Sequence, residues 1–92
     1  LDCSGLVHAV SRVLGLRTPR DAHDQAADLP NIPLDEARPG DLYFFARDSK
    51  PIHHVGFVSP TGMLHASETG KLLENAPLTE DRRKTLTTAA RF

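Results

Sequence analysis

The order of the predicted helices and strands is the feature that most constrains the fold of this chain. Apolar side chains at spacings of three and four residues predict a helix over residues 4–14, which Gly15 ends. A shorter helix is expected from Asp21 to about Leu29. Short β-forming runs bounded by turns predict strands over residues 42–46, 53–58, 63–66 and 71–75. Helices that precede a strand meander predict an α+β domain, with N-terminal helices packed on an antiparallel β-sheet.

The connecting segments and the C-terminal part carry weaker signals. We expect Pro30 to Pro33 to be irregular, residues 47–52 to form a polar loop and residues 79–85 to form a helical turn. The last residues are expected to be extended. The apolar positions of the first helix are predicted to form one stripe, which consists of Leu6, Val7, Val10, Val13 and Leu14.

Composition and charge exclude several function classes. The chain has 92 residues and a net charge of −1 without a basic stripe, so no nucleic-acid partner is indicated. No apolar run is long enough to span a bilayer. Cys3 is the only cysteine, which rules out an intrachain disulfide and a zinc cluster of several cysteines. A lone cysteine is either a small packing residue or a reactive thiol.

Cys3 lies at the N-terminus of the first predicted helix, where Asp2 and Ser4 supply N-cap chemistry. Unpaired backbone N–H groups and the positive end of the helix dipole favour a thiolate at such a position. The same N–H groups can stabilise the oxyanion of a tetrahedral intermediate. Cys3 is therefore a candidate nucleophile.

Two histidines are predicted to meet across a hairpin. If the turn at residues 59–62 places Ser59 opposite Gly62, then Gly56 faces His65 and His54 lies diagonally beside His65. Such diagonal neighbours have β-carbons about 7 Å apart, which is within imidazole reach. A glycine opposite His65 leaves room for the ring, and His53 points to the other face.

These residues fill the roles of a nucleophilic hydrolase. His54 is the candidate base that accepts the Cys3 proton, and His65 holds the His54 ring in the correct tautomer. The alternatives are a packing cysteine with structural histidines, or a metal site built from the same three side chains. The sequence has no local ligand spacing of the kind that metal sites use, such as Cys-x-x-Cys or His-x-x-x-His, so we expect no metal and no cofactor.

Four segments resemble motifs of the NlpC-type cell-wall cysteine peptidases, in family order and spacing. Residues 1–7, Leu-Asp-Cys-Ser-Gly-Leu-Val, resemble the nucleophile motif, and residues 39–45, Pro-Gly-Asp-Leu-Tyr-Phe-Phe, the first core strand. Residues 54–58, His-Val-Gly-Phe-Val, and 63–67, Met-Leu-His-Ala-Ser, resemble the strands that carry the base and the third catalytic residue. The resemblance implies a papain-like fold and a catalytic triad of Cys3, His54 and His65.

The same resemblance implies a reaction and a substrate. The expected reaction is hydrolysis of peptidoglycan stem peptides, at the bond between D-γ-glutamate and a diamino acid. Asp2 and Ser4 flank the nucleophile and are implied to shape the substrate site. Residues 19–22 with Gln25 resemble the dipeptidyl-peptidase branch, in which the aspartate at the position of Asp21 recognises a free N-terminal amine. A helix N-cap is the alternative role for Asp21, and Ala22 stands where that branch often has serine.

The start of the chain departs from the family pattern. Residues 1–92 are expected to be one catalytic domain that lacks the family's usual preceding segment, and SH3-like domains are expected in a full-length chain. The family implies a secreted or cell-envelope location, or a cytoplasmic one for a peptide-recycling enzyme. Two other functions stay open, namely a related papain-like amidase or acyltransferase, and a non-catalytic peptide-binding fragment.

Overall fold

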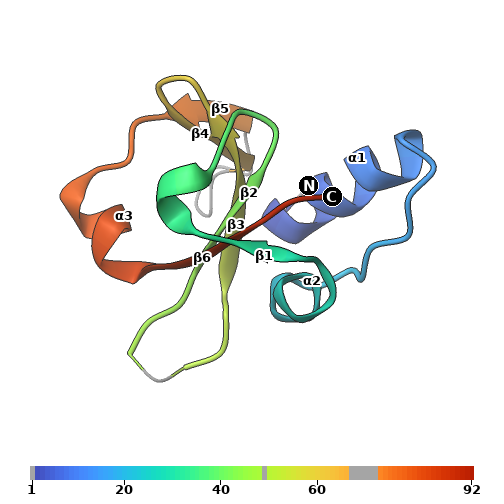
Figure 1. Ribbon diagram of the computed structural model, residues 1–92, viewed down its shortest axis with the longest axis horizontal. Helices are drawn as coiled ribbons and strands as arrows, with labels where there is room; N and C mark the ends of the chain where they lie inside the picture. The colour runs from blue at the N-terminus through green and yellow to red at the C-terminus, as the bar shows by residue number, and fades with distance from the viewer. Residues whose placement is uncertain (1, 49, 67–72) are drawn as a thin grey trace.

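The computed structural model describes residues 2–48, 50–66 and 73–92, and its central feature is one antiparallel sheet. The strand order is β1-β6-β2-β3-β4-β5, and every neighbouring pair is antiparallel (Figure 1). The strands are β1 (Asn31–Ile32), β2 (Leu42–Phe45), β3 (His54–Ser59), β4 (Gly62–Ala66), β5 (Leu73–Ala76) and β6 (Leu86–Ala90). The α+β fold predicted from the sequence is therefore confirmed.

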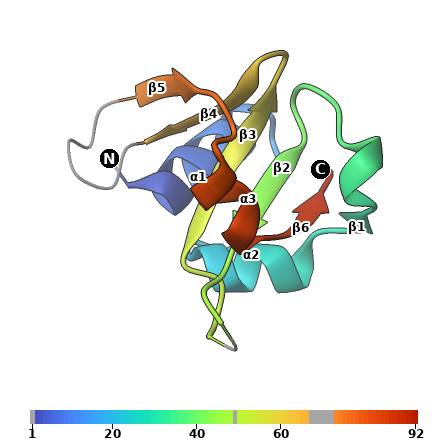
Figure 2. The ribbon, with the colours of Figure 1, turned by 90° about the vertical axis from the view of Figure 1, so that its left-hand side faces the viewer.

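The helices lie on both sides of this sheet. Helices α1 (Cys3–Val13) and α2 (Ala22–Asp28) lie on one side, and α3 (Glu80–Thr85) lies on the other (Figures 1 and 2). A 3-10 turn, η1 (Leu34–Glu36), precedes β2. The core between the first two helices and the sheet consists of Val7, Ala22, Leu42, Phe44, Val55 and Ala90. Each large apolar side chain buried there contributes about 1.5–3 kcal/mol.

Of the predicted apolar stripe of α1, Val7 is fully buried, but the rest of the buried face consists of small and polar residues. Its buried positions are Ser4, Gly5, Val7 and Ser11, whereas Val13 is 86% exposed and Leu14 is 60% exposed. Small residues allow the helix to approach the sheet closely, and the Ser11 hydroxyl donates a hydrogen bond to the His8 carbonyl at 2.8 Å. Gly15, at φ 76°, follows in the left-handed region and confirms the predicted helix stop.

The other predicted elements were largely confirmed, with one error. Residues 30–33 were expected to be irregular, but Asn31 and Ile32 form β1 and pair with Ala90 and Ala89 of β6. The predicted helical turn is α3, and the extended C-terminal residues are β6. The fourth predicted strand corresponds to β5, and its residues 71 and 72 lie outside the described residues. No helix in the described ranges is both long and apolar enough to cross a membrane.

A turn before β2 joins the middle of the sheet to its C-terminal strand. The Asp41 carboxylate accepts a hydrogen bond from the Arg38 amide at 2.9 Å. It also accepts two from the Arg91 guanidinium, at 2.9 and 2.8 Å. Gly40, at φ 96°, supplies the left-handed conformation that this turn requires. Asp41 therefore links the start of β2 to the residue that follows β6.

Candidate active site

Cys3 is the first residue of α1, and Asp2 caps the helix. The Asp2 backbone is extended, and its carboxylate accepts a hydrogen bond from the Gly5 amide at 2.8 Å. A β-carbon on Gly5 would lie 2.5 Å from that carboxylate oxygen, so a larger residue here would require the Asp2 side chain to shift. The partly buried Cys3 packs against the core that includes Val7 and Val55. The helix itself contacts β3 and β4, the two strands that hold the histidines.

Arg20 holds the capping carboxylate in place. Its guanidinium lies 2.9 Å from the Asp2 carboxylate and donates a hydrogen bond to the Ser4 hydroxyl at 3.0 Å. Burial by itself raises the pKa of Asp2, but the Gly5 amide and the Arg20 guanidinium outweigh it and hold that pKa below its ordinary value. The cap thus stays ionised. Both sequence-predicted neighbours of the nucleophile, Asp2 and Ser4, make contacts within the protein.

The two predicted histidines meet in the interior. His54 Nε2 and His65 Nδ1 are 2.8 Å apart, and the two side chains are 0% and 1% exposed. Their rings are nearly perpendicular, at 87°. The hairpin has the predicted register, because Ser59 pairs with Gly62 and Phe57 pairs with Leu64. The structure therefore confirms that the turn brings these two rings together.

Gly56 provides the space that the His65 ring occupies. A β-carbon at this position would lie 2.9 Å from the Met63 sulfur and 3.2 Å from the His65 β-carbon. Both distances are shorter than ordinary contacts between heavy atoms. The glycine predicted to make room for His65 therefore does so.

Glu74 is a site residue that the sequence analysis missed. Its carboxylate oxygen lies 2.8 Å from His65 Nε2, and β5 places it directly opposite His65 of β4. Its side chain is 52% exposed, so it joins the buried pair to the surface. The available signal was the strand predicted over residues 71–75, since its pairing with residues 63–66 would bring one of its residues opposite His65.

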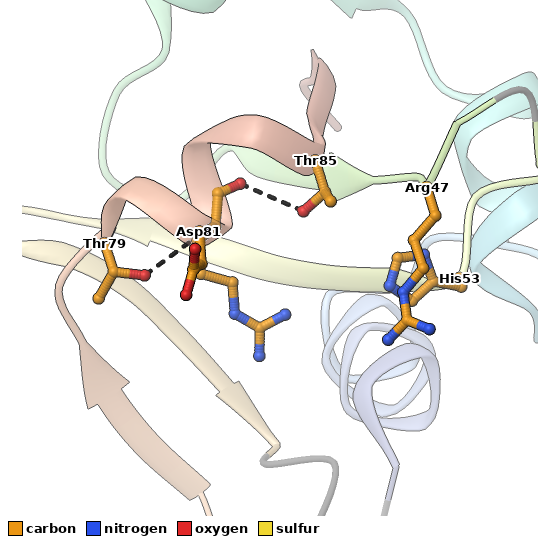
Figure 3. A pocket seen from close by; sticks show the side chains of 6 residues that line it. Arg47, His53, Thr79, Asp81 and Thr85 are labelled. Atoms are coloured by element: carbon orange, nitrogen blue, oxygen red, sulfur yellow. Dashed lines mark hydrogen bonds between the residues drawn. The ribbon is translucent and has the colours of Figure 1, made fainter.

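A basic pocket of about 220 Å³ lies beside the histidines. Figure 3 shows Arg47 and His53 on one side and the residues of α3 and its cap on the other; the lining is Arg47, His53, Thr79, Asp81, Arg82 and Thr85. The Arg82 guanidinium lies 5.6 Å from the centre of the Phe45 ring. That ring lies 5.6 Å from the His54 ring. The Phe45 ring thus lies between the Arg82 guanidinium and the His54 ring.

Asp21 occupies the N-cap position of α2, but its side chain makes no capping hydrogen bond. The residue is exposed. The N-cap alternative for Asp21 therefore has no support from the hydrogen bonding of this helix. Across residues 2–48, 50–66 and 73–92, no three His, Cys, Asp or Glu side chains form a group that could hold a metal ion.

Comparison with known proteins gives consistent matches. The model of the NlpC/P60 family matches residues 1–91. The γ-D-glutamyl-L-lysine dipeptidyl-peptidase of Bacillus subtilis is 45% identical over 82 residues, which cover 86% of this chain and 28% of that protein. The chain therefore spans less than a third of the length of this relative.

Solved structures show the same likeness. An NlpC/P60 family protein from Bacillus cereus superposes with a TM-score of 0.91 at 30% identity, over 99% of this chain and 31% of that chain. The peptidoglycan hydrolase RipB from Mycobacterium tuberculosis superposes with a TM-score of 0.83 at 30% identity, over 98% of this chain and 44% of that chain.

Proposed function

Because this chain belongs to the NlpC/P60 family, we propose that it is a cysteine endopeptidase of peptidoglycan stem peptides, with Cys3 as nucleophile and His54 as base. The observation that carries the proposal is the buried His54–His65 hydrogen bond on the strands against which α1, the Cys3 helix, packs. A base needs an orienting partner, and a buried imidazole pair supplies both groups.

The proposed reaction follows from these positions. His54 takes the Cys3 proton as the sulfur attacks the carbonyl carbon of the scissile bond. The first-turn amides have no acceptor within the helix, and the Gly5 amide donates to Asp2, so the Cys3 and Ser4 amides remain to donate to the oxyanion. The carbon–nitrogen bond then breaks, and His54 protonates the leaving amine. Water attacks the thioester, His54 accepts its proton, and the thiol is regenerated as the acid product leaves.

The proposed bond is the one between D-γ-glutamate and a diamino acid. The name of the Bacillus subtilis relative supports this choice, because that protein is called a γ-D-glutamyl-L-lysine dipeptidyl-peptidase. The exposed Asp21 carboxylate suits a free N-terminal amine on the stem peptide. The Arg82 guanidinium, which lies over the Phe45 ring beside His54, suits a free carboxylate of such a peptide.

The test is hydrolysis of L-alanyl-γ-D-glutamyl-L-lysine, followed by separation of the products. Cys3→Ala and His54→Ala are expected to lower kcat by about 100-fold or more, because each removes a group that takes part in bond breaking. His23→Ala is the control, since this histidine is exposed on α2 and the variant is expected to keep wild-type activity. Iodoacetamide is expected to inactivate the protein, with excess peptide protecting it.

Two results would overturn parts of the proposal. Unchanged hydrolysis by Cys3→Ala would remove Cys3 from the reaction, and binding of the peptide without any turnover would make the chain a peptide-binding module. An N-acetylated peptide tests whether Asp21 recognises the free amine. Asp21→Asn should raise KM for the peptide with a free amine and leave KM for the acetylated peptide unchanged. Asp24→Asn, on the exposed surface of α2, is the control for that comparison.

A further inference from the structure

Glu74, His65 and His54 form a continuous hydrogen-bonded line across three adjacent strands. The Glu74 carboxylate lies 2.8 Å from His65 Nε2, and His65 Nδ1 lies 2.8 Å from His54 Nε2. The three side chains come from β5, β4 and β3, so the sheet register fixes their order. The Glu74 end of this line is half exposed, and the His54 end is fully buried.

The line determines which nitrogen of each ring carries a proton. An ionised carboxylate can only accept, so His65 Nε2 must donate to Glu74. A neutral His65 then has a bare Nδ1, which accepts a hydrogen bond from His54 Nε2. In a neutral His54 the bare nitrogen is consequently Nδ1.

We propose that Glu74 is a positioning residue of the reaction, which fixes the tautomer of His65 and through it makes Nδ1 the basic nitrogen of His54. This inference rests on the proposed function for its kinetic consequence, but the tautomers themselves do not depend on turnover. Without Glu74, His65 is free to carry its proton on Nδ1. It would then offer a donor where His54 Nε2 needs an acceptor.

The charge of Glu74 has a second, smaller effect. When His54 takes the Cys3 proton it becomes an imidazolium, and a carboxylate on the far side of His65 stabilises that positive charge. Because the Glu74 side chain is 52% exposed, water screens much of this attraction. Selection of the tautomer is thus the larger part of its role.

The experiment replaces Glu74 and measures both kinetics and ring nitrogens. Glu74→Ala is expected to lower kcat by about 10–100-fold with KM changed less than about twofold, because the base is misoriented while substrate contacts persist. Glu74→Gln keeps an acceptor oxygen and should recover part of the lost kcat. Nitrogen-15 NMR of the imidazoles should show a bare Nδ1 on His65 in the wild type and a mixture of tautomers in Glu74→Ala.

The neighbouring Asn75 provides the matched control. It also lies on β5, but its hydrogen bonds go to Ser59 and Thr61 on the exposed side of the hairpin. Asn75→Ala should perturb the strand without changing kcat or the imidazole spectra.

Two outcomes would overturn the inference. The first is a Glu74→Ala variant with wild-type kcat, and the second is an unchanged set of tautomers in that variant. If the wild-type protein cuts no peptide, the proposed function fails, yet the imidazole spectra still decide the role of Glu74.

Discussion

At the scale of single residues, the site depends on two glycines, whose lack of a side chain leaves room for their neighbours. Gly5 lets the Asp2 cap approach α1, and Gly56 leaves the volume that the His65 ring fills. Gly5 lies close to the proposed nucleophile, and Gly56 lies close to the proposed base. Adding a single methyl group at either is therefore expected to displace a functional side chain.

Gly56→Ala is the sharper of these two tests. Its new β-carbon would meet Met63 and His65 inside ordinary contact distance, which is expected to cost about 1–3 kcal/mol of stability and to displace the His65 ring. Thermal unfolding and kcat are measured together. Gly15→Ala is the control: no atom lies within 4 Å of its β-carbon, and its positive φ costs stability alone. A Gly56→Ala protein with wild-type kcat would show that the ring tolerates the methyl group.

The sequence predicted the histidine pair but not Glu74, for a physical reason. The turn at residues 59–62 fixes the hairpin register, and register alone decides which side chains face each other. Glu74 follows the β4–β5 connection, where no such turn motif was recognised, and a glutamate in a short strand looks like any solvated residue. Its partner became evident only from the pairing of β5 with β4.

At the scale of helices and strands, Gln25 joins α2 to the start of α1. Its fully buried amide donates hydrogen bonds to the Ser4 carbonyl at 3.0 Å and to the Pro19 carbonyl at 2.8 Å. One side chain thus holds the first turn of the Cys3 helix and the segment that leads into α2. The relative position of Cys3 and Asp21 depends on this contact.

Gln25→Ala is expected to lower the free energy of unfolding by about 2–3 kcal/mol, because two buried carbonyls lose their donor. Urea unfolding measures the loss. Asp28→Ala, on the exposed surface of the same helix, is expected to change it by less than about 0.5 kcal/mol. Equal effects of the two substitutions would mean that the hydrogen bonds of Gln25 do not stabilise the fold.

Element prediction failed where a long-range contact overrides the local pattern. β1 contains two residues between prolines, and only its pairing with β6 makes it a strand. The apolar periodicity of residues 4–14 continues through Val13 and Leu14, although both side chains are exposed in the structure. For β1 the deciding partner is distant in sequence, whereas α3 is set by its local Thr79 cap and the hairpin by its local turn.

At the scale of the whole molecule, the ion pair between Asp41 and Arg91 links the start of β2 to the residue that follows β6. This ion pair predicts that the stability of the fold falls at acidic pH. Hydrogen bonding from Arg91, together with the Arg38 amide, holds the pKa of Asp41 below its ordinary value despite the opposing effect of burial. A carboxyl with a lowered pKa stabilises the fold above its unfolded pKa of about 3.9, and this stabilisation is lost as the pH falls through the folded value.

Asp41→Asn is therefore expected to lower the urea midpoint at about pH 6, and the difference from wild type should shrink below about pH 4. Asp35→Asn in η1 is the control, because that carboxylate is exposed. A difference that stays constant between about pH 6 and pH 3 would show that the Asp41 charge is not responsible.

The position of β6 also has a consequence for biosynthesis. This C-terminal strand lies between β1 and β2, and Arg91 follows it. Because translation proceeds from the N-terminus, the edge of β2 stays unpaired while residues 86–91 are still inside the ribosome. A nascent chain can therefore form the histidine hairpin before β6 is available to pair with β2. Completion of this sheet waits until residues 86–91 have left the ribosome.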